Sequence, residues 1–235
     1  MITVVSNGSP VELGDGATVT DLPAADTVRQ PPTEFFAGDR FTGLCMIAAP
    51  LLLATGAALL VGIYEGSADD RLEAFAANQA RASVAVNAAI AGVVLAVFAV
   101  AGVAVMVARH RPGLGRAGGT LTIIGLFGPA FFLGINHVGI RLADLADRPG
   151  AARVFENAET TPNIVNLAGP ALLVGFVLLA VGTAKTGVLP RPRSWALGAA
   201  ALIPIGLISG FVIISVIACL ALAAALVPLG FRLLR

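Results

Sequence analysis

The chain has 235 residues, of which 57% are hydrophobic and only 12% charged, with a mean hydropathy of +0.89 and a formal net charge of +1. Soluble domains carry about 25% charged residues, so this composition excludes a soluble globular enzyme and a disordered chain. The small net charge provides no field for binding nucleic acid, and we expect no nucleic-acid partner. Uncharged apolar stretches of about 20 residues recur, and each could cross a bilayer. The sequence therefore predicts an all-α, polytopic transmembrane helix bundle.

Residues 1–41 are expected to form a cytoplasmic polar head. The segments Ile2–Val5 and Val11–Leu13, separated by Asn7-Gly8, predict a small β-hairpin with a two-residue turn. The run Gln30-Pro31-Pro32-Thr33 predicts a stiff linker into the membrane.

The start of this head resembles a known family. The stretch from Asn7-Gly8 through Gly16-Ala17-Thr18-Val19 to Leu22 resembles the opening of the small ubiquitin-like sulfur carriers. The resemblance covers only about the first 22 residues, and the later strands of those carriers are absent. The terminal Gly-Gly that their chemistry requires is also absent, so we do not expect sulfur transfer.

Residues 42–235 are predicted to form a six-span transmembrane domain. Its last segment, Trp195–Phe231, carries no charge over 37 residues and would be about 55 Å long as one straight helix, nearly twice the thickness of the hydrocarbon core. We expect it to fold back within Ser209–Ser215, and we expect Pro204 to kink the fifth span. The six expected spans are 41–64, 84–108, 118–140, 163–184, 195–211 and 214–231.

The distribution of Lys and Arg predicts the orientation. With the N-terminus inside, ten of the 15 Lys and Arg residues fall on the cytoplasmic side and five on the outer side. The asymmetry is clearest in the loops 109–116 and 185–193, which contain no acidic residue. We therefore expect both termini in the cytoplasm and a multi-pass protein of the plasma membrane. The abundance of alanine and the excess of arginine over lysine are typical of a bacterial genome rich in G and C.

A faint internal repeat links the first four spans. Spans one and three carry glycine and proline in a similar order, and each is followed by an outer segment of about 20 residues and a span that opens with asparagine. This pattern favours a parallel repeat of two helical hairpins, with a third, tighter pair after them. The alternative is that helices rich in Ala, Gly and Leu resemble one another by composition alone.

Polar side chains are rare within the spans, so their positions carry information. In hydrocarbon an amide or an imidazole needs a hydrogen-bond partner, and these groups could therefore share one pocket near the outer leaflet. The alternative is that they bind lipid headgroups or join helices. The candidate ligand-binding residues are Glu65, Asn87, Asn136, His137, Arg141, Asn163 and Asn166.

Two outer segments are prone to form amphipathic helices. Residues 69–83 place Leu72 and Phe75 on one face, and residues 141–156 repeat the pattern with Leu142 and Phe155. Such segments either cap the polar layer or lie on the membrane surface. We expect capping.

The preferred hypothesis is a protein that binds, or helps to transport, an apolar or lipid-like ligand near the outer leaflet. One alternative is an accessory subunit of a larger complex, with the small residues between Ala88 and Ala108 as its helix–helix interface. Another is a membrane-embedded enzyme acting on a lipid or an isoprenoid, with His137 and Glu65 as acid and base. The expected partner is membrane lipid. We expect no metal and no cofactor, because the chain has neither a Cys/His cluster nor a Gly-rich phosphate loop.

Overall fold

Five long helices make up most of the apolar part of the chain. They are α1 (Asp39–Leu60), α3 (Gln79–Ala108), α4 (Pro112–Leu142), α6 (Ile164–Thr186) and α9 (Val212–Leu234). The computed structural model describes residues 4–6, 9–11, 38–145, 147–160, 164–208 and 211–235. Each of the five helices contains a stretch that is long and apolar enough to cross a membrane. The protein is therefore a helical, multi-pass integral membrane protein.

The chain divides into two units, residues 1–34 and residues 35–235. In the first unit, strands β1 (Val4–Ser6) and β2 (Ser9–Val11) pair antiparallel, with Ser6 opposite Ser9. The Asn7-Gly8 pair predicted to form the turn and the predicted linker at 30–33 lie outside the described residues. All the helices belong to the second unit.

The segment predicted to form the fifth span is not a single α-helix. It consists of α7 (Arg191–Ala199), a 3₁₀ helix η2 (Ala200–Leu202) and α8 (Ile203–Ile208). Pro204 explains the break, because proline lacks the amide N–H that would bond to the Ala200 carbonyl, and its ring crowds that carbonyl. These short pieces are not among the five long helices. The count of six spans and the cytoplasmic placement of both termini therefore stay predictions.

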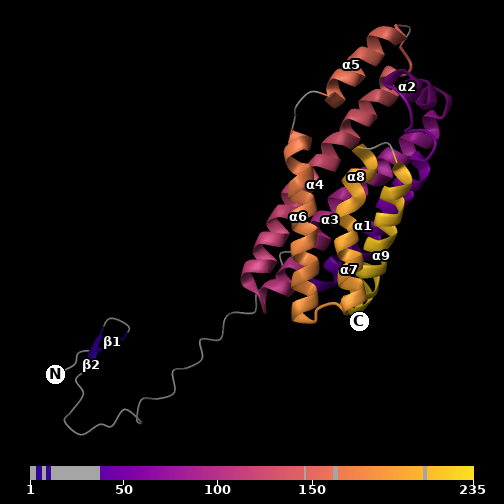
Figure 1. Cartoon of the computed structure of the whole chain (residues 1–235). Coiled ribbons are helices and arrows are strands. Elements are labelled where there is room, and N and C mark those ends of the chain that lie inside the picture. Colours follow the sequence, from indigo (N-terminus) through magenta and orange to yellow (C-terminus); the bar gives the residue numbers. More distant parts are fainter. Residues whose placement is uncertain (1–3, 7–8, 12–37, 146, 161–163, 209–210) are drawn as a thin grey trace. The chain divides into compact units, whose positions relative to one another are not determined.

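Figure 1 shows the long helices side by side. Their contacts form a ring of three hairpins. Within the hairpins α1 packs against α3, α4 against α6, and α7 and α8 against α9. Neighbouring hairpins meet where α3 packs on α4, α6 on α7, and α9 on α1. Two short helices, α2 (Ala68–Ala77) and α5 (Arg148–Thr160), connect the long helices of the first two hairpins and contact each other. This shared order of elements is compatible with a parallel repeat, which itself stays a prediction.

Glycines set the distances between neighbouring helices. A Cβ built on Gly43 of α1 would lie 2.8 Å from the carbonyl oxygen of Gly230 on α9, so a side chain there would push the two helices apart. A Cβ on Gly125 of α4 would overlap the backbone of Leu172 on α6. Such close backbone approach is typical of helix pairs in membranes, where packing provides the attraction.

The small-residue stripe predicted on the second span is used inside the bundle. A Cβ on Gly92 of α3 would lie 2.8 Å from Cγ of Leu53 on α1, and Ala104 and Ala108 face Gly115 of α4. The stripe therefore lets α3 approach two helices of its own chain. An interface with another subunit through this stripe stays a prediction.

The interior of the ring is apolar and almost filled. A cavity of about 20 Å³ lies at its centre, lined by side chains from α1, α3, α4, α6, α8 and α9, including Leu53, Val100, Phe176 and Leu222. This volume has room for about one water molecule, and apolar cavities of this kind stay dry. The centre of the ring therefore has no room for a ligand.

Candidate functional site

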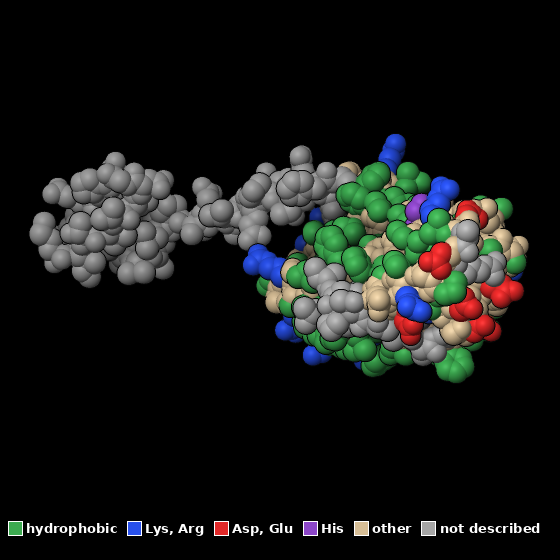
Figure 2. All heavy atoms as spheres, turned by 90° about the horizontal axis from the view of Figure 1, so that it is seen from above, with side chains coloured by type: hydrophobic (Ala, Val, Ile, Leu, Met, Phe, Trp, Pro, Cys, Tyr) green, Lys and Arg blue, Asp and Glu red, His purple; other side chains and the backbone are tan. Residues whose placement is uncertain are grey.

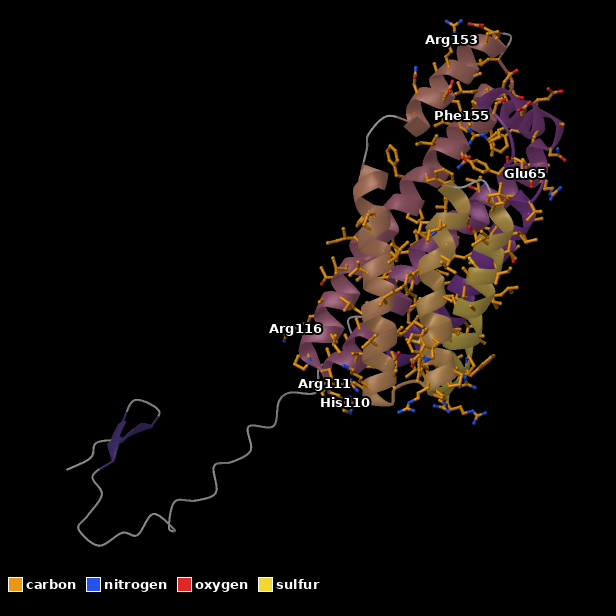
Figure 3. All side chains as sticks on the ribbon, viewed as in Figure 1. Glu65, His110, Arg111, Arg116, Arg153 and Phe155 are labelled. Carbon is orange, nitrogen blue, oxygen red and sulfur yellow. The ribbon has the colours of Figure 1, made fainter. Side chains whose placement is uncertain are left out.

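The two ends of the ring differ in charge. The connections 61–83 and 141–163, which contain α2 and α5, carry eight acidic residues and five arginines. Viewed from this end, acidic side chains lie among arginines (Figure 2). The opposite end, where Arg111 and Arg116 lie (Figure 3), is strongly basic. Following the positive-inside prediction, we call the α2–α5 end the outer end and the opposite end the basic end.

A capping box fixes the start of α2 at the outer end. The Ser67 hydroxyl donates to Oδ2 of Asp70 at 2.6 Å, and the backbone N–H of Ser67 donates to the same oxygen at 2.8 Å. In return, the Asp70 N–H donates to the Ser67 hydroxyl at 3.3 Å. The hydrogen bonds from the Ser67 side chain and backbone lower the pKa of Asp70. The charged carboxylate is thus held at the helix N-terminus, where the helix dipole also favours it.

A cluster of aromatic rings and one arginine joins α2 to α5. The Phe75 and Phe155 rings meet edge to face, with centroids 6.2 Å apart. The Arg71 guanidinium lies 4.8 Å from the Tyr64 ring centroid and 5.2 Å from that of Phe155, and its Nη1–H donates to the Tyr64 hydroxyl at 2.7 Å. Such cation–π contacts are favourable when partly shielded from water. The predicted capping role of the two segments therefore has a physical basis in this cluster.

Phe155 fits over a glycine of α4. A Cβ on Gly139 would lie 2.5 Å from Cε2 of Phe155, so any other residue at position 139 would displace the ring. Phe155 is 1% exposed, and its ring is therefore the main anchor of α5 on the bundle. Figure 3 shows it in the outer part of the molecule, between α5 and the helices below.

An apolar groove of about 270 Å³ lies between α4 and α5. Phe155 forms part of its wall, while Phe131, Val138 and Val154 are 45%, 53% and 57% exposed and leave it open at the side. No side chain that lines it is charged or polar. Its lining residues are Phe131, Gly134, Ile135, Val138, Leu142, Val154, Phe155 and Ala158.

The depth of the groove follows from helix contacts. Ala104 of α3 contacts Gly119 of α4. Asn87 lies 17 residues from Ala104 towards the outer end, and Asn136 lies 17 residues from Gly119 in the same direction. The two asparagines therefore lie at about the same height along the bundle. Gly56, which packs between Ala85 and Ala89, shares that height and lies four residues, about 6 Å, before the end of α1. The groove extends from about one turn below this height to more than one turn above it. It therefore lies near the outer end of the bundle.

Those predicted site residues that the structure describes do not share one pocket. Glu65 and Arg141 are exposed, Asn136 is fully buried and His137 is half-buried. Asn87 shares the height of Asn136 but is exposed, because it belongs to the outward face of α3 together with Val84 and Val94. Asn163 lies outside the described residues, and the Asn166 side chain also lies outside them.

Asn136 and His137 have incompletely satisfied polar groups. The Asn136 Nδ2–H donates to the Phe132 carbonyl at 2.9 Å, but its Oδ1 has no partner, nor has Nδ1 of His137. Other buried polar groups are satisfied: the hydroxyls of Thr122 and Ser215 donate to backbone carbonyls at 2.7 and 2.8 Å. No hydrogen bond or ion pair joins His137 to Glu65 within the described part of the chain.

Sequence reasoning missed most of the groove. It selected polar residues, whereas the groove is built from apolar ones, and only Leu142 and Phe155 appeared among its candidate capping residues. The spacing of Phe131, Gly134, Val138 and Leu142, three or four residues apart on one helix face, could have shown the α4 wall. The same spacing is expected for any helix face turned to lipid, so the packing of α5 was needed to identify a groove.

Comparison of the chain with known protein families, with curated proteins and with solved structures found no match. Within the described ranges, no group of three or more His, Cys, Asp or Glu side chains could hold a metal ion. The groove is therefore the feature from which a function can be proposed.

Proposed function

We propose that the protein binds the hydrocarbon chain of a lipid-like molecule in the groove between α4 and α5. The observation that carries this proposal is the groove itself: about 270 Å³, wholly apolar in its lining side chains, and open at the side near the end of the bundle that carries α2 and α5. Its volume is close to the lower end of the range for ligand sites, about 300–1,000 Å³. A segment of an acyl or isoprenoid chain from the outer leaflet is a suitable occupant.

The physics of the bilayer limits what such a groove can do. A lipid tail gains little by moving from other tails into an apolar groove, because both surroundings are equally free of water. Binding therefore comes from shape and close packing. We expect selectivity for the shape of the chain and modest affinity, as suits a protein that holds a lipid temporarily while it is presented or transferred.

Gly134 provides a direct test. No atom lies within 4 Å of a Cβ built at this position, so Gly134→Trp would place an indole in the groove without a backbone clash. Gly113, on the same helix at the basic end, is equally open, and Gly113→Trp is the matched control. The assay is cross-linking of a photoactivatable acyl-chain probe to the purified protein, with the labelled peptides identified by mass spectrometry.

We expect the probe to label peptides of α4 and α5 in the unaltered protein and in Gly113→Trp. Labelling at these peptides should be lost in Gly134→Trp. The proposal would be abandoned if labelling were spread evenly over the lipid-facing helices, or if both variants kept it.

A further inference from the structure

The basic end carries a concentrated positive charge. The start of α1, the turns 109–116 and 185–193, and the end of α9 together contain nine Lys and Arg residues, against one acidic residue, Asp39. At the outer end, acidic residues outnumber basic ones, eight to five. The nine basic residues are Arg40, Arg109, Arg111, Arg116, Lys185, Arg191, Arg193, Arg232 and Arg235.

Helix packing brings two of the basic turns together. A Cβ on Gly182 of α6 would lie 2.7 Å from Cγ1 of Val107 on α3 and 3.6 Å from Cβ of Leu114 on α4. Lys185 follows Gly182 by three residues, and Arg111 precedes Leu114 by three. Both cations therefore lie about one helical turn from a point where three helices meet.

The same residues lie at the ends of apolar helices, and helix ends of this kind meet the lipid headgroups in a bilayer. Their helices end there: α3 at Ala108 and α6 at Thr186. Arg111, Lys185 and Arg191 are exposed. Trp195, in the helix that follows the second turn, is 72% exposed, and tryptophan is enriched where a membrane protein crosses the boundary between hydrocarbon and headgroups.

We propose that the junction of the two turns binds the headgroup of an anionic phospholipid from the leaflet at the basic end. The phosphate would be held by Arg111 of the first turn and by Lys185 and Arg191 of the second, with Trp195 beside the glycerol region. Charge complementarity identifies the occupant, since basic clusters directly beside transmembrane helices attract anionic lipids and guanidinium groups bind phosphate strongly. This site is separate from the groove, and neither proposal depends on the other.

The test compares two double variants that each remove two positive charges. Arg111→Gln/Lys185→Gln alters the junction, and Arg141→Gln/Arg153→Gln alters exposed arginines at the outer end as the matched control. Phosphatidylglycerol and phosphatidylcholine, offered together at equal concentration, are counted on the protein by native mass spectrometry.

We expect the unaltered protein and the control variant to retain phosphatidylglycerol in preference to phosphatidylcholine. The junction variant should bind phosphatidylglycerol about twenty-five-fold more weakly, since each basic side chain near an anionic surface contributes roughly a fivefold gain in affinity. Raised salt should weaken the binding in the same direction.

Three results would overturn the proposal. The unaltered protein could retain both lipids equally, a result that does not depend on the variants folding. The two double variants could lose the anionic lipid to the same extent. Finally, inorganic phosphate alone could raise the thermal stability of the protein as much as phosphatidylglycerol does, which would assign the junction to a soluble anion.

Discussion

Gly125 and Gly134 lie on the same helix, but the first is packed against a neighbouring helix and the second is open. The contrast provides a prediction for single residues. A Cβ at Gly125 overlaps the backbone of Leu172, whereas a Cβ at Gly134 meets no atom within 4 Å. We expect Gly125→Ala to destabilise the protein by about 1–3 kcal/mol through overpacking. Gly134→Ala should be neutral, or stabilising by up to about 1 kcal/mol through helix propensity.

Thermal unfolding of the two variants in the same detergent would check this contrast. Equal melting temperatures would contradict the close packing of α4 on α6.

The asparagines show how far sequence can place single residues. The sequence places Asn87 and Asn136 near the outer leaflet, and the helix contacts give them about the same height. Counting residues along a span is enough for this, because every helix rises by the same amount per residue. Direction around the helix axis is different: it depends on which faces meet neighbours, and Asn87 faces outward while Asn136 faces inward. The predicted common pocket needed both kinds of information.

At the scale of elements, α5 depends on a single large anchor. Phe155 is buried against Phe75 and Gly139, while its neighbour Val154 is mostly exposed. We expect Phe155→Ala to weaken the docking of α5 by about 3–5 kcal/mol, the usual effect of removing a buried aromatic ring. Trypsin should then cut after Arg153 faster than in the unaltered protein.

Val154→Ala is the control, and it should leave the rate of cutting unchanged. If Phe155→Ala were cut no faster, the ring would not be what holds α5, and the wall of the groove would have to be explained in another way.

The sequence indicated both outer helices but only part of how they pack. Leu72 and Phe75 were placed on one face of the first, and both are buried. The predicted segment 69–83 is not one helix, because α2 ends at Ala77 and residues 79–83 belong to α3. Periodicity predicts a face within one helix, but it does not show where a helix ends against tertiary contacts. The contact between Phe75 and Phe155 joins residues 80 positions apart, which local patterns cannot predict.

At the scale of the whole molecule, the distribution of charge predicts orientation. The native cysteines, Cys45 and Cys219, are 1% and 2% exposed, so the unaltered protein should react slowly with a maleimide that cannot cross membranes. Glu73→Cys at the outer end should be labelled in intact cells. Arg116→Cys at the basic end should be labelled only after permeabilisation. The reverse pattern would place the termini outside and would contradict the positive-inside prediction.

The class of the protein follows from composition alone, because few charges and long apolar runs leave no other solution. The ring of three hairpins does not follow from composition. It depends on which glycines meet which neighbours, as at Gly125 and Gly182, and each helix offers several glycines.

The contact between Gly43 and Gly230 joins α1 to α9. A ribosome makes α1 before α9, so this contact can form only after the helices between them have been made. A chain that stopped before residue 212 would lack α9, and the backbone of α1 at Gly43 would face lipid in place of Gly230.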